Sequence, residues 1–179
     1  MRLANGADER PVTPDSLAKS IGQEQTFAVN VGELDELRRV LLEQVDQVAR
    51  RLRRHAFKAR TVTLKLRYGD FTTLTRSHTL GEATNITQEL WQASEALLMA
   101  WSKKDHRALR LLGMTATGFT GEHGGQLPLF DRPGAKKMQQ LDKTLDAIAE
   151  KFGDEAVRRG ASKGKDQNTR GKADEEGGR

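Results

Sequence analysis

Apolar and polar residues alternate along four short segments of this chain, which is the pattern of strands with one buried face. The alternation is strict where Val62, Leu64 and Leu66 point one way and threonine, lysine and arginine point the other. A Gly69-Asp70 turn and then a stretch rich in β-branched residues follow, which together predict a hairpin. The four strands are expected at residues 18–29, 61–67, 71–77 and 107–115.

Three other segments carry apolar residues at steps of three and four, which predicts helices with one apolar stripe. Asn30 is the expected N-cap of the first helix, with Glu33 in the capping-box position. Thr84 or Asn85 is the expected cap of the second, and Gly153 ends the third. The helices are expected at residues 34–52, 84–101 and 136–152.

The element order β-α-β-β-α-β predicts an α+β domain, a four-stranded sheet with two helices on one face, followed by a C-terminal helix. The other face of the sheet is then left to solvent or to a partner. With 36% apolar and 31% charged residues, the core should be modest and part of the chain unstructured. The expected organisation is an extended lead-in at 1–16, the sheet domain at 17–118, a loop at 119–135, a helical region at 136–160 and a disordered tail at 161–179.

Positive charge is concentrated in one stretch of a chain whose net charge is +5. No acidic residue falls between Asp46 and Asp70, and Thr61 and Thr63 add hydroxyls to the polar side of a strand there. Such a face suits phosphates, although a solvated surface is the alternative. Few aromatic residues interleave with the charges, which favours tracking of a duplex backbone over base stacking. The basic residues are Arg50, Arg51, Arg53, Arg54, Lys58, Arg60, Lys65 and Arg67.

A loop carries the apolar string Gln126-Leu127-Pro128-Leu129-Phe130, with glycines before it and Pro133-Gly134 after it. Pro128 argues against a helix interior or a central strand. From the physics alone, the peptide either fills a partner's pocket or folds back on its own domain.

The residues indicate no catalytic or metal site. Cysteine is absent, and the four histidines are far apart and lack metal-ligand spacing. No glycine-rich phosphate loop precedes a helix, and no carboxylate pair lies where two metals would be held. No segment is long and apolar enough to span a membrane, so a cytoplasmic protein is expected.

Three segments, residues 19–27, 59–77 and 110–114, resemble the little-finger domain of Y-family DNA polymerases, most closely the bacterial DNA polymerase IV type. The resemblance implies an open sheet face that lies in the major groove of duplex or primer-template DNA, in translesion synthesis and DNA repair. It also implies binding of damaged DNA. The matching DNA-binding positions are Lys19, Ser20, Gly22, Thr61, Thr63, Lys65, Thr75, Arg76, Ser77, Arg110 and Thr115.

The same resemblance assigns the loop peptide. Gln126, Leu127, Leu129 and Phe130 match the family's peptide that binds the sliding clamp (the beta clamp). The apolar side chains should be buried by the clamp, and Gln126 should supply a directional hydrogen bond. The helix at 136–152 could mask the peptide until the clamp arrives.

The chain departs from this family because the palm, the fingers and most of the thumb are missing. Residues 2–14 look like the connection from the thumb, and the chain reads as a fragment, an excised domain or a truncated gene product. The resemblance places magnesium only in the parent family, so no cofactor and no activity are expected of this chain alone. A monomer associated with the nucleoid is expected. A clamp-binding decoy without productive DNA contact is the alternative.

Overall fold

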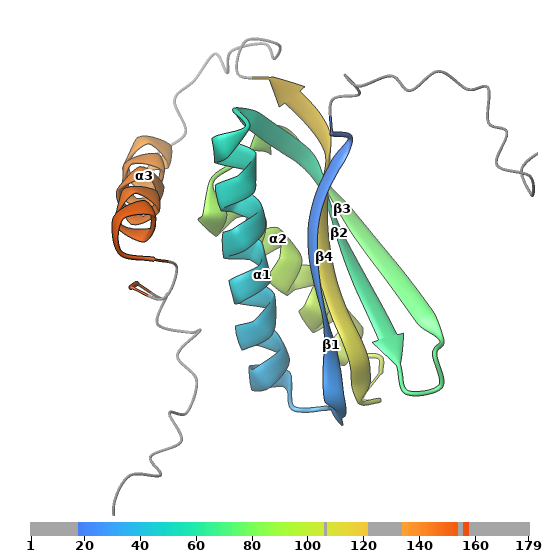
Figure 1. Ribbon diagram of the computed structural model, residues 1–179. Coiled ribbons are helices and arrows are strands. Elements are labelled where there is room, and N and C mark those ends of the chain that lie inside the picture. Colours follow the sequence, from blue (N-terminus) through green and yellow to red (C-terminus); the bar gives the residue numbers. More distant parts are fainter. Residues whose placement is uncertain (1–17, 106, 122–133, 154–155, 158–179) are drawn as a thin grey trace, which may run out of the picture.

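The computed structural model describes residues 18–105, 107–121, 134–153 and 156–157 (Figure 1). The described elements confirm the predicted order β-α-β-β-α-β, with a further helix after it. They are β1 (Ser20–Val31), α1 (Leu34–Arg54), β2 (Phe57–Tyr68), β3 (Thr73–Thr84), α2 (Thr87–Ser102), β4 (Leu109–Gly121) and α3 (Ala135–Phe152).

The strands form one antiparallel sheet in the order β1-β4-β2-β3. The central pair, β4 and β2, is flanked by the edge strands β1 and β3. Both α1 and α2 cover the same face of the sheet, and no described helix or strand covers the other face (Figure 1). The α+β prediction with two helices on one face is therefore confirmed.

The core lies between the sheet and these two helices. On β2, Val62, Leu64 and Leu66 are fully buried, as their alternation predicts. On α1, the stripe that includes Leu41 and Val45 is fully buried against them. Each such side chain contributes about 1.5–3 kcal/mol by leaving water, so the apolar pattern fixes which face of each strand turns toward the helices.

Both predicted N-caps are wrong. Asn30 belongs to β1, too early in the chain to cap α1, and the residue before α1 is Glu33, with no side-chain cap bond. The residue before α2 is Ile86, whose backbone N–H donates to Thr84 Oγ1 at 3.1 Å. Asn85 donates instead to a backbone carbonyl of β2. The third and fourth strands also run further than predicted, and β4 continues past the boundary predicted at 118.

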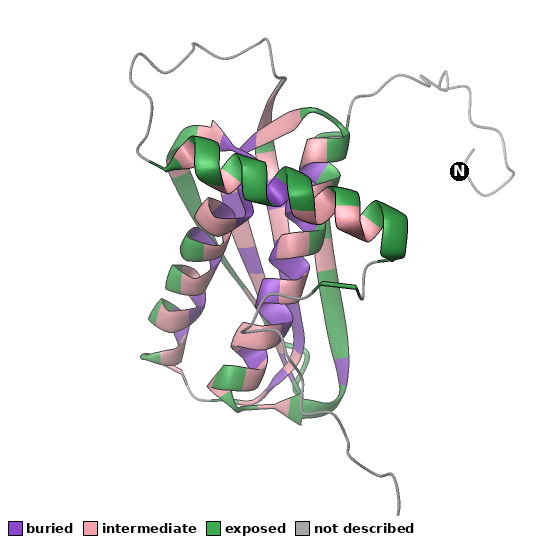
Figure 2. Cartoon of the chain, turned by 90° about the vertical axis from the view of Figure 1, so that its left-hand side faces the viewer, coloured by how far each residue is buried: buried purple, intermediate pink, exposed green. Residues whose placement is uncertain are grey.

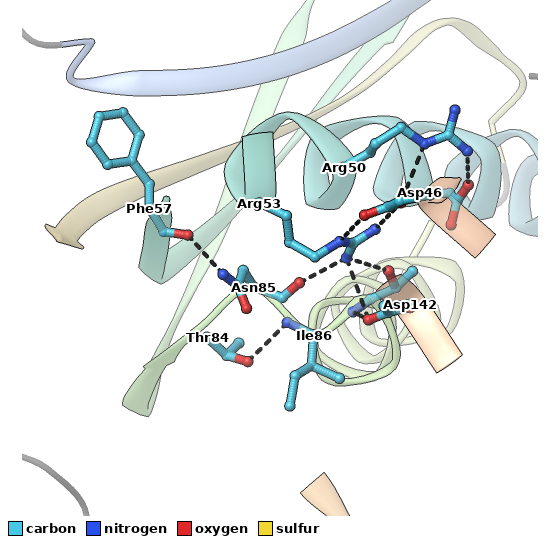
Figure 3. A network of polar contacts seen from close by, with 10 residues as sticks. Asp46, Arg50, Arg53, Phe57, Thr84, Asn85, Ile86 and Asp142 are labelled. Atoms are coloured by element: carbon cyan, nitrogen blue, oxygen red, sulfur yellow. Dashed lines mark hydrogen bonds and ion pairs between the residues drawn. The ribbon is translucent and has the colours of Figure 1, made fainter. Parts of the chain in front are cut away.

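The third helix docks on the other two through carboxylates. Arg53 of α1 donates from Nε to Asp146 Oδ2 at 2.6 Å and from Nη2 to Asp146 Oδ1 at 2.8 Å. Its Nη1 lies 3.3 Å from Asp142 Oδ2. Figure 3 shows Asp142 reaching toward Arg53 beside the start of α2. Helix α3 is thereby held against the last turn of α1.

Asp142 also caps α2 from outside that helix. The backbone N–H of Thr87, the first residue of α2, donates to Asp142 Oδ2 at 2.9 Å, and Asp142 is only 2% exposed. Burial disfavours the charged form of Arg53, but its hydrogen bonds to Asp146 and the charge of Asp142 outweigh burial and raise its pKa above the usual value. The carboxylate of Asp142 thus serves both helices.

The apolar stripe of α3 is only partly buried. Leu141 is 51% exposed and Phe152 is 66% exposed, whereas Met138, Leu145 and Ile148 are half-buried. Figure 2 shows α3 lying across α1 and α2 with mostly exposed and intermediate positions. Gly153 ends the helix, as predicted, with a positive φ of 89°. The one fully buried residue of α3 is Asp142, so the most buried contacts of this helix are polar.

We expect Asp142→Ala to release α3. The change removes the acceptor of a buried N–H and one partner of Arg53, so the free energy of unfolding should fall by about 1–3 kcal/mol. Urea denaturation and hydrogen exchange of the α3 amides measure these effects. Glu150→Ala, on an exposed position of the same helix, is the matched control. Equal stability and equal exchange in the two variants would show that Asp142 does not hold the helix.

Candidate nucleic-acid interface

The open face of the sheet presents four rows of side chains, each running across all four strands. Residues paired across antiparallel strands share a face, so the registers define these rows directly. Most of the positions carry serine or threonine. We call this surface the hydroxyl face; its rows, in the order β1, β4, β2, β3, are Ser20, Thr117, Thr61, Thr79; Gly22, Thr115, Thr63, Ser77; Glu24, Gly113, Lys65, Thr75; and Thr26, Leu111, Arg67, Thr73.

Small side chains with hydroxyl groups dominate the hydroxyl face. Neighbouring hydroxyls lie within contact range, as between Thr61 Oγ1 and Thr79 Oγ1 at 3.3 Å. The glycines leave room for neighbouring side chains, since a Cβ at Gly22 would lie 2.7 Å from Thr115 Oγ1. Hydroxyls and exposed backbone groups bind phosphate and sugar oxygens without reading base edges.

Two of the charged side chains on the face, Lys65 and Glu24, form an ion pair across a central strand. Lys65 Nζ on β2 lies 2.8 Å from Glu24 Oε2 on β1, although β4 runs between them. Gly113 of β4 stands between the two in the same row. A Cβ at Gly113 would lie only 2.8 Å from Glu24 Cβ, so glycine there gives the glutamate room to lie over β4. Arg67 is the other cation on the face.

The basic stretch is divided among several places and does not form the single face that the sequence suggested. Arg50 and Arg53 pair with carboxylates of α3. Arg51 donates to the backbone carbonyl of Gly22 at 3.1 Å and so braces β1. The basic residues of this stretch that lie on the hydroxyl face are Lys65 and Arg67.

Most of the predicted DNA-binding residues do meet on one surface. Lys19 is exposed and directly precedes β1, and Arg110 lies at an irregularity in β4, between the residues that pair with Arg67 and Tyr68. The predicted residues on the hydroxyl face are Ser20, Gly22, Thr61, Thr63, Lys65, Thr75, Ser77 and Thr115. These residues therefore lie on one surface, and their role in DNA binding stays a prediction.

Arg76 is the exception and requires a correction. It pairs with Leu64, which is fully buried under the helices, so its side chain belongs to the helix-covered side of the sheet. There it lines a cleft with Leu97 and Trp101. The cause is the alternation of β3, which sends Thr75 and Ser77 to one face and Arg76 to the other.

Several residues of the hydroxyl face were missed from the sequence. Thr79 and Thr117 lie where β3 and β4 extend beyond their predicted ends. Thr26 and Thr73 lie at the opposite end of the sheet, at positions where the alternation along β1 and β3 predicts side chains on the open face. Continuing the alternation through each strand would have found all four.

A hydrogen-bonded cluster fixes one corner of the sheet. Trp101 Nε1 donates to the Tyr68 hydroxyl at 2.9 Å, and that hydroxyl donates to Asp105 Oδ2 at 2.6 Å. Arg107 Nη2 donates to the same oxygen at 2.9 Å, and its guanidinium lies 3.7 Å from the Tyr68 ring centroid. The end of α2, the end of β2 and the approach to β4 are thereby joined.

The hydrogen bonds from Arg107, and next those from Tyr68, hold the pKa of Asp105 well below its usual range. The same interaction with Asp105 raises the pKa of Arg107 above its usual value. Asp105 is therefore the ionised acceptor of this cluster at neutral pH.

Three other predictions from the sequence concern the clamp peptide, metal sites and membrane spans. The clamp-binding residues Gln126, Leu127, Leu129 and Phe130 fall outside the described residues. Within the described part of the chain, no group of three or more histidine, aspartate or glutamate side chains is placed to hold a metal. None of its helices is long and apolar enough to cross a membrane.

The sequence has relatives among DNA polymerases. A profile described as the impB/mucB/samB family C-terminal domain matches residues 18–129. DNA polymerase IV of Desulfatibacillum aliphaticivorans is 39% identical over 157 residues, which are 87% of this chain and 39% of that protein. DNA polymerase IV 1 of Mesorhizobium japonicum is 34% identical over 164 residues, 92% of this chain and 37% of the relative. The chain thus spans less than half the length of these relatives.

Solved polymerases share the fold. A Y-family DNA polymerase chimera of Dbh and Dpo4 superposes with a TM-score of 0.54 at 17% identity, over 67% of this chain and 34% of the chimera. An insertion ternary complex of Dbh DNA polymerase gives a TM-score of 0.52 at 16% identity, over the same shares of the two chains. The fold is thus that of the little-finger domain of Y-family polymerases. The chain belongs to the impB/mucB/samB family and contains its C-terminal domain.

The corner cluster predicts a defined pH dependence of stability. Because the pKa of Asp105 is lower in the folded state, its charge stabilises the fold above the unfolded pKa of about 3.9. That contribution is lost as the pH falls from there toward the folded pKa. We expect Asp105→Asn to lower Tm at neutral pH, and its difference from the parent to shrink below about pH 4.

Thermal melts followed by circular dichroism across this pH range measure the effect. Tyr68→Phe removes both hydrogen bonds of the hydroxyl, the one from Trp101 Nε1 and the one to Asp105 Oδ2. It should also lower Tm, and part of that loss should persist in acid because the bond from Trp101 does not depend on the charge of Asp105. A Tm difference that stays constant down to the most acidic buffer would mean that the charge of Asp105 is not what stabilises the corner.

Proposed function

We propose that this chain is the DNA-binding and clamp-binding module of a Y-family DNA polymerase that acts in translesion synthesis and DNA repair. Its ligands are duplex or primer-template DNA, damaged or intact, and the sliding clamp. The observation that carries the DNA part is the hydroxyl face, an uncovered sheet surface on which most positions are serine or threonine.

The face fits a sugar-phosphate backbone better than it fits base edges. Specific base contacts need long side chains with paired donors and acceptors, such as arginine or glutamine in the major groove. The hydroxyl face instead offers short hydroxyls and two cations, Lys65 and Arg67. Binding should therefore be weakly sequence-specific and should fall with rising salt as phosphates release their counterions.

Glu24 limits the strength of this contact. Its carboxylate lies 2.8 Å from Lys65 Nζ, so a phosphate that approaches Lys65 must compete with it. This pairing is also the observation that favours the second candidate function, a clamp-binding decoy without productive DNA contact. Measured affinity for DNA separates the two.

The clamp part rests on the residues of the loop peptide and on where its neighbours lie. Gln126, Leu127, Leu129 and Phe130 match the family's clamp motif. The segment that contains them connects the end of β4 to α3, which the carboxylate contacts hold on the helix layer. A peptide tethered at both ends has less conformational freedom to lose on binding than a free tail.

The proposal covers DNA and clamp binding, because the residues of this sequence match the family's C-terminal domain, whereas the resemblance places the magnesium-binding carboxylates in the palm and fingers. We further propose that the module works as a monomer in the cytoplasm, associated with the nucleoid through its DNA contact.

A single strand supplies a matched test of the DNA site. Ser77 lies on the hydroxyl face, whereas His78, the next residue, pairs with buried Val62 and belongs to the helix-covered side. Both are exposed. We expect Ser77→Glu to weaken binding to a labelled duplex roughly tenfold or more through repulsion of phosphates, and His78→Glu to change it little. Fluorescence anisotropy at several salt concentrations measures both. Equal losses in the two variants would remove the hydroxyl face as the DNA site.

The clamp contact is tested separately. We expect Leu129→Ala combined with Phe130→Ala to abolish binding to an immobilised sliding clamp, because the two side chains supply most of the buried apolar area. Binding of the same variant to duplex DNA should be unchanged. Surface plasmon resonance measures the first and anisotropy the second. A variant that still binds the clamp with the parent's affinity would show that the peptide is not the clamp site.

A further inference from the structure

One exposed aromatic residue stands beside the hydroxyl face without a role in the core. Phe71 is 63% exposed, in the turn between β2 and β3. Thr73, two residues on, is in the last row of the hydroxyl face. The ring therefore lies at the end of the surface on which the DNA backbone is proposed to run.

The backbone at Phe71 is strained. Its φ is +65°, a left-handed conformation in which glycine or asparagine is common and an aromatic residue is an outlier. The turn holds this conformation through two backbone bonds of 3.0 Å, from Phe71 N–H to Tyr68 O and from Tyr68 N–H to Thr72 O. Asp70 Oδ1 accepts from Thr72 N–H at 2.8 Å. A bulky ring is thus presented to solvent from a rigid turn.

A guanidinium already lies against the ring. Arg110 Cζ is 4.9 Å from the Phe71 ring centroid, within the range of a cation–π contact. Arg67 Nε donates to Thr73 Oγ1 at 2.8 Å, and Arg107 is held by the Tyr68–Asp105 cluster at the same corner. The charge of Arg107 is matched by Asp105, so Arg67 and Arg110 are the cations that combine with the aromatic plane to offer a stacking surface and attraction for phosphates.

We propose that Phe71, with Arg110, binds an unpaired nucleobase where single-stranded nucleic acid leaves the duplex on the hydroxyl face. A base inside a duplex is covered on both planes by its neighbours, whereas an unpaired base in a single strand is free to lay one plane against the ring. The proposal rests on the function proposed above and adds a ligand to it: the base, in addition to the phosphates. Stacking of this kind tolerates every base.

The test compares three DNAs that share one duplex: blunt-ended, with a short single-stranded overhang, and with the same overhang made of abasic units. The full chain should bind the base-bearing overhang roughly fivefold or more tightly than the abasic one. In Phe71→Asn, which suits a left-handed backbone, this preference should vanish while affinity for the blunt duplex stays the same. A melting curve of the variant confirms that it folds.

Phe152→Asn is the matched control, since Phe152 is 66% exposed but lies on α3. It should keep the preference. In a second readout, the parent and Phe152→Asn should quench 2-aminopurine placed in the overhang, and Phe71→Asn should not.

The outcomes separate this inference from the proposed function. Binding of the blunt duplex without any gain from overhang bases overturns the base site and leaves the hydroxyl face standing. A preference that survives in Phe71→Asn also overturns the base site. Failure of the parent to bind all three DNAs overturns both.

Discussion

The structure depends on a single constraint: one face of an antiparallel sheet is sealed by α1 and α2 while the other stays open. Side chains alternate along every strand, so sealing one face decides the orientation of each residue in the sheet. A register shift of one residue would carry Leu64 to solvent and Thr63 into the core. The burial of the apolar side chains therefore also assembles the hydroxyl face, on which Leu111 is the one buried apolar side chain.

This constraint explains both the success and the failure of the sequence reading. The alternation along residues 61–67 correctly predicts which side chains are buried, because every second residue there is apolar and lies under the helices. The family motif at Thr75, Arg76 and Ser77 covers three consecutive residues, which cannot all lie on one face of a strand, and Arg76 is the one on the helix-covered side. The caps were missed for a different reason. Asn30 and Thr84 are good capping residues, but β1 and β3 extend through these positions, and strand pairing took precedence over the local preference.

The docking of α3 was beyond the reach of sequence patterns. Its apolar stripe predicted the helix, yet the contacts that place it are carboxylates whose partners are 55 and 93 residues away in the chain. Nothing in the spacing of Asp142 and Asp146 marks the first as buried or either as a partner of Arg53. The pair between Glu24 and Lys65 is similar, because it exists only where Gly113 of the intervening strand leaves space. Such contacts depend on the sheet order, which becomes known only with the fold.

The balance of charge on the hydroxyl face bears on why a clamp peptide would accompany it. A surface with two cations, one of them paired with Glu24, neutralises few phosphates, so its affinity for DNA should be modest at physiological salt. Weak, backbone-directed contact allows a module to slide along DNA of any sequence, but it does not keep the module there. A second attachment through a short tether turns rebinding into an intramolecular event and raises the overall affinity without any new DNA contact. On the proposed function, the weak face and the tethered peptide are complementary, because strengthening the face alone would reduce the mobility that a sliding clamp provides.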